Sequence, residues 1–174
     1  LSAVNGIGWS LKYALGDLIK DKEVVLLAVE EDGYAIEYAS DSLRKDKEVV
    51  LAAVRQNGWS LKYVLGDLRA DKKVVLAAVR QNGSVLGYAL GDLREDKEIV
   101  LAAVRQNGVA IHFALGGLRQ HHFLKSIASE TKRGKDVDIS YDLFCFVEKN
   151  PELYKMLVLV SKKKSKLMCD LNPS

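Results

Sequence analysis

The sequence repeats itself with a period of 25 residues, and no other feature limits the possible folds as strongly. One glycine marks each period without insertion or deletion, at Gly8, Gly33, Gly58, Gly83 and Gly108. The copies occupy residues 1–20 (the last 20 positions of a unit), 21–45, 46–70, 71–95 and 96–120. A fixed period of this length predicts a tandem array in which each unit packs on its neighbours. Because the first copy is partial, we expect the array to continue upstream of Leu1.

The first half of each unit is predicted to form an α-helix. In the unit 46–70, Asp46 is a favourable N-cap residue, and Glu48 complements the helix dipole in the first turn. An apolar face follows at helical spacing, formed by Val49, Val50, Ala53 and Val54. Gly58 is predicted to follow this helix as its C′ residue, with a positive φ.

The second half of the unit is predicted to form a shorter helix, which begins near Trp59 and is about 12 Å long at the α-helical rise. Its apolar positions follow at i, i+3, i+4 and i+7, at Leu61, Val64, Leu65 and Leu68. Gly66 is predicted to break this helix or to tighten it into a short 3₁₀ turn. Stacked pairs of such helices predict an all-α fold, a right-handed α-solenoid.

Two other folds have partial support in the same pattern. Asn57-Gly58 is a hairpin signal, and a 25-residue period also fits leucine-rich repeats. However, Ala52-Ala53 is unfavourable in a strand, and the residues around Asn57 do not alternate between apolar and polar. Gln56 stands where a leucine-rich repeat needs an apolar side chain. The pattern therefore favours helix–turn–helix units.

The unit resembles a family of tandem helical repeats with the signature Asp-Lys-Glu-Val-Val-Leu-Ala-Ala-Val-x-x-Asn-Gly-x-x-Leu-x-Tyr-Ala. The resemblance covers residues 1–120 and recurs in register. That family is catalogued as a domain of unknown function and occurs in unicellular eukaryotes, including algae, and in proteins of intracellular bacteria. The resemblance implies no activity, cofactor or catalytic residue. The unit 21–45 departs from its siblings at Glu30-Glu31-Asp32, where they carry Arg-Gln-Asn.

Residues 121–174 depart further from the unit and are predicted to form a helical C-terminal cap on the array 1–120. His121 replaces the capping Asp, and a helix is still expected through about residue 130. Further helices are predicted at 141–149 and from Pro151 onward, because Pro is favoured in the first turn of a helix. Terminal units of repeat arrays are atypical because they cover the last apolar face.

Composition and motifs favour a protein that has no catalytic activity. The 174 residues include 26 Lys and Arg against 23 Asp and Glu, and the two signs balance over residues 1–120. The sequence contains no P-loop, no dinucleotide-binding glycine pattern, no nucleophile elbow and no zinc motif. Two cysteines are too few for a secreted disulfide scaffold, and no apolar run is long enough to span a membrane. The chain is therefore predicted to be a non-enzymatic intracellular protein that needs no metal or cofactor.

Positions that vary between units are the candidates for recognition, because positions that repeat serve packing. On the second helix the packing row barely changes, at Leu11, Ile36, Leu61, Leu86 and Ile111. Two rows beside it vary: the first holds Trp9, Tyr34, Trp59, Ser84 and Val109, and the second holds Lys12, Glu37, Lys62, Gly87 and His112. We call these two rows the variable strip, and residues three apart on a helix place them on one face.

The aromatic end of the variable strip is predicted to bind a partner. It combines Trp9, Tyr34 and Trp59 with the charges of Lys12, Glu37 and Lys62. Aromatic side chains beside charges are typical anchors of protein interfaces. In the alternative interpretation, Trp9 and Trp59 fill the groove between units. The tyrosines at 38, 63 and 88 are expected to form a packing row between units.

Charged residues are a second set of candidates for contact with a partner or with solvent. Glu30 and Glu31 oppose the helix dipole at the end of their helix, and they are either part of a contact surface or the result of neutral drift. Two arginine rows are expected to form solvated ridges. One consists of Arg44, Arg69, Arg94 and Arg119, and the other of Arg55, Arg80 and Arg105. A basic cluster near the C-terminus offers contact to an anionic surface, through Lys162, Lys163, Lys164 and Lys166.

The leading functional hypothesis is a protein–protein interaction module, either an adaptor or a structural subunit of a larger assembly. One alternative is a nucleic-acid-binding array that uses the arginine rows, although a nucleic-acid module usually has a basic balance that residues 1–120 lack. The other alternative is a non-catalytic segment of a multidomain effector enzyme.

Overall fold

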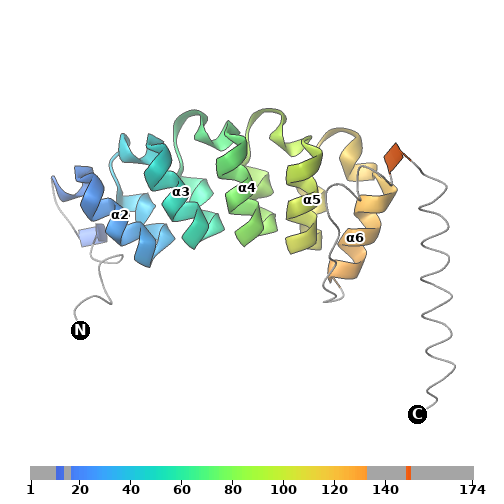
Figure 1. Cartoon of the computed structure of the whole chain (residues 1–174), viewed down its shortest axis with the longest axis horizontal. Helices are drawn as coiled ribbons and strands as arrows, with labels where there is room; N and C mark the ends of the chain where they lie inside the picture. The colour runs from blue at the N-terminus through green and yellow to red at the C-terminus, as the bar shows by residue number, and fades with distance from the viewer. Residues whose placement is uncertain (1–10, 14–16, 133–147, 150–174) are drawn as a thin grey trace, which may run out of the picture. The chain divides into compact units, whose positions relative to one another are not determined.

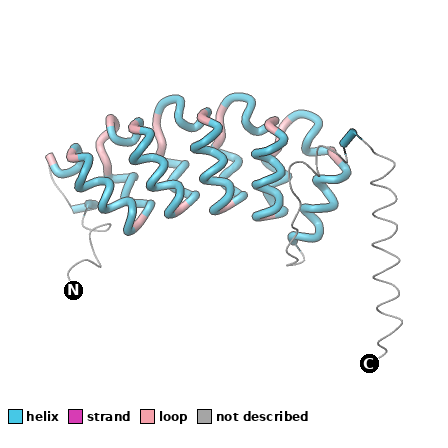
Figure 2. The backbone as a smooth tube through the Cα atoms, in the orientation of Figure 1, coloured by secondary structure: helices cyan, strands magenta, loops and turns pink. Residues whose placement is uncertain are grey.

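Helices and the short turns between them make up the part of the chain that the structure describes. The computed structural model describes residues 11–13, 17–132 and 148–149. These ranges contain α-helices and 3₁₀-helices and no β-strand (Figure 2). The prediction of an all-helical fold is therefore confirmed for the described residues.

The chain divides into two compact units, Leu1–Val137 and Asp138–Ser174. The helices described below belong to the first of these units. The predicted helix from Pro151 onward lies outside the described residues, and so does the predicted helix 141–149 apart from Glu148 and Lys149.

Within the described residues, five α-helices stand side by side in the order of the sequence (Figure 1). They are α2 Lys22–Glu31, α3 Lys47–Gln56, α4 Lys72–Gln81, α5 Lys97–Gln106 and α6 His122–Lys132. The predicted N-cap is present: Oδ1 of Asp46 accepts the backbone N–H of Glu48 at 2.9 Å and that of Val49 at 3.2 Å. These bonds satisfy two of the N–H groups that an α-helix leaves without a partner at its start.

The second half of each unit is a 3₁₀-helix, and the prediction of a short α-helix there is wrong. The 3₁₀-helices of this set are η1 Leu11–Tyr13, η3 Gly33–Tyr38, η5 Gly58–Tyr63, η7 Gly83–Tyr88 and η9 Gly108–Phe113. A second, shorter set leads into the α-helices, formed by η2 Leu18–Lys20, η4 Leu43–Lys45, η6 Gly66–Ala70, η8 Gly91–Arg94 and η10 Gly116–Gln120.

Hydrogen bonds to the neighbouring unit explain why the second helix is short. The side chain of Asn57 starts η5 by accepting the N–H of Trp59 at 3.0 Å. After Tyr63 the backbone becomes extended, and the N–H of Leu65 donates to the carbonyl of Arg44 in the preceding unit at 3.1 Å. A donor that pairs with another unit cannot continue the helix, so Leu61 and Leu68 belong to different helices. The predicted tightening into a 3₁₀ turn at Gly66 is confirmed.

The glycine that marks each period has a different role from the one predicted. Positive φ occurs at Gly66, Gly91 and Gly116 among the described residues, and not at Gly58. A Cβ atom on Gly58 would lie 2.5 Å from the carbonyl oxygen of Ala78 in the next α-helix. Gly58 therefore allows two units to approach closely, and the left-handed conformation belongs to Gly66, which introduces η6.

Neighbouring units bury their apolar side chains between two rows of helices. The α-helices contact one another in one row, and the six-residue 3₁₀-helices contact one another in a second row. Each of these 3₁₀-helices also contacts the α-helix of its own unit and that of the next, as η5 does with α3 and α4. The predicted packing row is buried throughout, at Leu11, Ile36, Leu61, Leu86 and Ile111.

At each of three junctions, one arginine side chain donates a hydrogen bond to the backbone of the next unit. The Nε atoms of Arg44, Arg69 and Arg94 donate to the carbonyls of Tyr63, Tyr88 and Phe113 at 2.8, 2.9 and 2.7 Å. All three side chains are half-buried. The predicted solvated ridge is therefore wrong at these positions, because each guanidinium is held between two units.

A lysine and the capping aspartate of the next unit form a second link. The Nζ atoms of Lys22, Lys47 and Lys72 lie 2.8, 2.5 and 2.8 Å from Oδ2 of Asp46, Asp71 and Asp96. At Asp71 the bond from Lys47 lowers the pKa below its ordinary value; burial acts in the opposite direction, and the N–H groups of the next helix add to the lowering. One carboxylate thus caps its own helix and pairs with the preceding unit.

Removing the hydroxyl of Ser60 is expected to stabilise the protein. Its Oγ atom is buried and has no hydrogen-bond partner among the described residues. The equivalent positions of the units 21–45, 71–95 and 96–120 carry Ala35, Val85 and Ala110, and the partial first copy carries Ser10. A buried polar group without a partner costs about 1–3 kcal/mol, so we expect Ser60→Ala to raise the free energy of unfolding by about 1 kcal/mol. Urea denaturation measures this change, and Ser42→Ala, at an exposed serine, serves as the control. A loss of stability in Ser60→Ala would show that the hydroxyl is satisfied in solution.

Candidate functional site

The first row of the variable strip lies at the second position of each 3₁₀-helix. Tyr34 is 39% exposed and Val109 is 42% exposed, whereas Trp59 and Ser84 are half-buried. Trp9 lies outside the described residues. The row therefore presents apolar surface to solvent in two units and lies partly covered in the two units between them.

Each described aromatic ring of this row also packs on a tyrosine of the next unit. The ring centroids of Tyr34 and Tyr63 are 6.2 Å apart with an interplanar angle of 77°. Trp59 and Tyr88 show the same edge-to-face arrangement, at 6.0 Å and 69°. Edge-to-face contacts of this kind are favourable for aromatic pairs. The tyrosines thus meet their neighbours across the junction, as the packing row predicts, and they support the rings of the variable strip from one side.

Two charged side chains of the second row, Glu37 and Lys62, lie near the Tyr63 ring. Lys12, Glu37 and Lys62 are exposed, and the Nζ atom of Lys62 lies 5.4 Å from the centroid of the Tyr63 ring. Burial, together with the nearby carboxylate of Glu37, raises the pKa of the Tyr63 hydroxyl above its ordinary value. The hydroxyl therefore stays protonated at neutral pH. In a 3₁₀-helix residues three apart eclipse one another, which aligns Glu37 with Tyr34.

Glu30 and Glu31 end α2, and both side chains are exposed. The carbonyl of Glu31 accepts a hydrogen bond from Nε2 of Gln56 in the next unit at 3.0 Å, while Oε1 of Gln56 accepts the N–H of Gly33 at 2.7 Å. The amide of Gln56 thus donates a hydrogen bond to the carbonyl at the end of α2. The carboxylates of Glu30 and Glu31 could not do this, because an ionised carboxylate only accepts hydrogen bonds.

Glu30 lines a groove between α2 and α3. The groove has a volume of about 540 Å³, an apolar floor that includes Leu26 and Leu51, and Arg55 among its walls. Leu27, next to this groove in sequence, is 59% exposed, and its siblings are alanines. Glu30 thus belongs to the row of α-helices, whereas Tyr34 belongs to the row of 3₁₀-helices. Comparing Leu27 with the alanines of its siblings would have indicated this surface from sequence.

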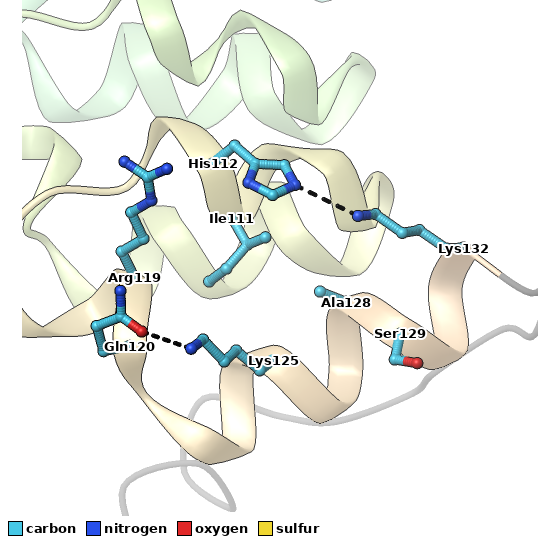
Figure 3. A pocket seen from close by; sticks show the side chains of 8 residues that line it. All are labelled: Ile111, His112, Arg119, Gln120, Lys125, Ala128, Ser129 and Lys132. Carbon is cyan, nitrogen blue, oxygen red and sulfur yellow. Dashed lines mark hydrogen bonds between the residues drawn. The ribbon is translucent and has the colours of Figure 1, made fainter.

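Sequence analysis missed a second hollow, at the C-terminal end of the described array. We call it the end pocket; it has a volume of about 400 Å³, and its polar lining consists of His112, Arg119, Gln120, Lys125, Ser129 and Lys132 (Figure 3). These residues come from η9, η10 and α6. The signal that could have found it is the pair Lys125 and Ser129, which stand where the earlier units carry valine.

Metal ligands, membrane spans and the basic cluster near the C-terminus complete the description of the candidate sites. The described residues contain no cluster of three His, Cys, Asp or Glu side chains that would suit a metal ion. No helix among them is long and apolar enough to cross a membrane. The basic cluster at Lys162, Lys163, Lys164 and Lys166 lies outside the described residues.

Comparison with known proteins gives one match. The family model described as "Domain of unknown function (DUF4116)" matches residues 1–40, 21–69 and 71–119. Searches of curated proteins and of solved structures return no match.

Proposed function

We propose that this chain, which belongs to the family described as Domain of unknown function (DUF4116), is a non-enzymatic module that binds another protein through its variable strip. The partner contact centres on Tyr34 and Trp59, with Glu37 and Lys62 at its edge, and extends toward Trp9 and Lys12. The framework that carries this surface is a right-handed α-solenoid with a helical cap over 121–174. In this role the chain acts as an adaptor or as a structural subunit of a larger assembly.

The contrast between constant and variable positions supports the proposal. Positions that join units recur from unit to unit, as the arginine–carbonyl bonds and the buried packing row do. The variable strip instead carries aromatic, hydroxyl and aliphatic side chains at one and the same place in the unit. Because this position accepts side chains as different as tyrosine, serine and valine, the fold does not require one particular contact there, and the position can serve recognition.

Partial exposure of a supported aromatic ring is the observation that carries the proposal. Tyr34 presents 39% of its surface to solvent while its ring rests against Tyr63. A ring held from one side loses little freedom on binding, and Tyr and Trp are the most frequent anchors of protein interfaces. Lys62 and Glu37 add charges of both signs beside it, which favours a partner with mixed polar and apolar surface.

The same geometry makes a nucleic-acid-binding array the weaker proposal. Such an array would use both arginine rows, but Arg44, Arg69 and Arg94 are half-buried and donate to backbone carbonyls. The exposed arginines of these rows lie in a stretch whose charges balance, at Arg55, Arg80 and Arg119. Phosphate contacts need exposed cations, and binding through them weakens steeply with salt. Partner binding that persists in high salt is therefore expected.

The double substitution Tyr34→Ser and Trp59→Ser tests the proposal. Serine occurs at this position in the unit 71–95, so the fold tolerates it. We expect the capture of protein partners from cell extract, quantified by mass spectrometry, to fall about tenfold or more, the effect typical of interface anchors. The melting temperature is expected to change little.

A matched control distinguishes specific recognition from non-specific binding to any exposed apolar side chain. Leu90 is about as exposed as Tyr34 but lies outside the variable strip, so Leu90→Ser is expected to leave partner capture unchanged. The proposal fails if the double variant melts at a much lower temperature while its folded fraction still captures the partner. In that case the two rings serve packing between units.

A further inference from the structure

The end pocket lies where the next 3₁₀-helix would pack if the array simply continued. At an internal junction the equivalent space is filled by the second half of the following unit, as η9 fills the space beside α5 and η7. The arginine at that junction, Arg94, gives its Nε hydrogen to the carbonyl of Phe113 in η9. The equivalent residue at the end of the array is Arg119, which is exposed and has no hydrogen-bond partner among the described residues.

The sequence of α6 changes the chemistry of this space from apolar to cationic. In α2 to α5 two positions facing it are valines with no exposed surface, at Val25, Val29, Val50, Val54, Val75, Val79, Val100 and Val104. In α6 the same two positions are Lys125 and Ser129, both exposed. The apolar contact with a following unit is thereby replaced by an ammonium group and a hydroxyl group.

The polar groups of the end pocket come from three elements and lie around Ile111 in Figure 3. Lys125 donates from Nζ to Oε1 of Gln120 at 2.5 Å, at the start of α6. Lys132, at the other end of α6, lies with Nζ 3.4 Å from Nε2 of His112 in η9. Arg119 adds the guanidinium of η10. Among the described residues that line the pocket none is acidic, and its three cations repel one another.

We propose that the end pocket binds a phosphate group. A dianionic oxyanion offsets the repulsion among Arg119, Lys125 and Lys132, and its oxygen atoms accept from ammonium and guanidinium donors alike. Ser129 and Gln120 add neutral hydrogen-bonding groups, and His112 adds its ring nitrogens. The volume of about 400 Å³ leaves room for a phosphate carried on a larger group. The end pocket shares His112 with the variable strip but contains neither Tyr34 nor Trp59, so the inference does not depend on the proposed function.

Titration calorimetry of the full chain at low ionic strength tests the proposal, with inorganic phosphate and pyrophosphate as soluble probes. We expect saturable binding at one site per chain, with pyrophosphate the tighter ligand. Arg119→Gln and Lys125→Gln should each weaken binding about tenfold, because each removes one charge-assisted hydrogen bond. Both side chains are exposed, so the melting temperature is expected to stay within a degree or two of the parent value.

Two controls distinguish specific phosphate binding in the end pocket from non-specific attraction of anions to a basic protein. Arg80→Gln removes the same charge from an exposed position on α4, away from the end pocket, and is expected to leave binding unchanged. Acetate, a monoanion, is expected to bind at least tenfold more weakly than phosphate. Equal effects of Arg80→Gln and Arg119→Gln, or equal binding of acetate and phosphate, would overturn the proposal.

A vesicle arm identifies the source of the phosphate. Sedimentation with phosphatidylcholine vesicles that contain phosphatidic acid is compared with vesicles of phosphatidylcholine alone. Binding to the soluble probes without sedimentation supports a soluble phosphorylated ligand, whereas sedimentation that Lys125→Gln abolishes supports a lipid headgroup. Absence of binding in both arms would refute the proposal.

Discussion

The Gly83→Ala substitution is expected to lower the free energy of unfolding by about 3 kcal/mol or more, the upper range for overpacking a core. A Cβ atom at this position would lie 2.1 Å from the carbonyl oxygen of Ala103 in the next α-helix. Because that oxygen belongs to backbone, no side-chain rotation relieves the contact, and the two units have to move apart. The same shift strains the hydrogen bond from the N–H of Gly83 to Oε1 of Gln106. Thermal and urea denaturation measure the loss.

Gly117→Ala is the matched control for this substitution. A Cβ atom there would meet no other atom within 4 Å, and Gly117 has no positive φ. Alanine at such a site restricts the unfolded chain and is expected to stabilise the protein by about 0.4–1 kcal/mol. If both variants melted together with the parent protein, the spacing of the units would not depend on the marking glycines.

Removing a buried leucine is expected to have different consequences in the middle and at the end of the array. Leu61 in η5 and Leu124 in α6 are both fully buried. Truncating either side chain to alanine costs about 2–5 kcal/mol of local packing. In a repeat array each unit contacts only its neighbours, so Leu124→Ala is expected to release α6 alone, whereas Leu61→Ala weakens the junctions on both sides.

Hydrogen exchange followed by mass spectrometry separates the two outcomes. In Leu124→Ala we expect faster exchange confined to α6 and the adjacent η9 and η10, with α3 and α4 protected as in the parent protein. In Leu61→Ala we expect faster exchange from α3 through α4. An equal increase over all described helices in both variants would show that the array unfolds as one cooperative block.

The candidate surfaces could be predicted from the sequence only in part. The variable strip emerged from comparing units, because Tyr34, Trp59 and Ser84 occupy one position of the repeat. The end pocket did not, because its recognition requires knowing which valines of α5 face the following unit. The role of Arg44 was also missed, since sequence shows its charge and spacing but not the carbonyl of Tyr63 that receives its hydrogen bond.

The sequence by itself determined the period, the helical class and the family of this protein. Each of these depends on local information: a capping Asp before an apolar helical face, an Asn-Gly pair after it, and strict recurrence every 25 residues. Such signals act within one unit, where backbone hydrogen bonds and side-chain spacing decide between helix and strand.

Tertiary structure alone decided the form of the second helix and the use of the glycines. The N–H of Leu65 pairs with Arg44 of the preceding unit, and this bond ends η5 where the apolar spacing would have allowed an α-helix to continue. Gly58 lies against the carbonyl of Ala78 from the following unit, whereas Gly66 adopts the positive φ. Both outcomes depend on atoms 20 or more residues away, and a pattern within one unit holds no information about how closely the next unit packs.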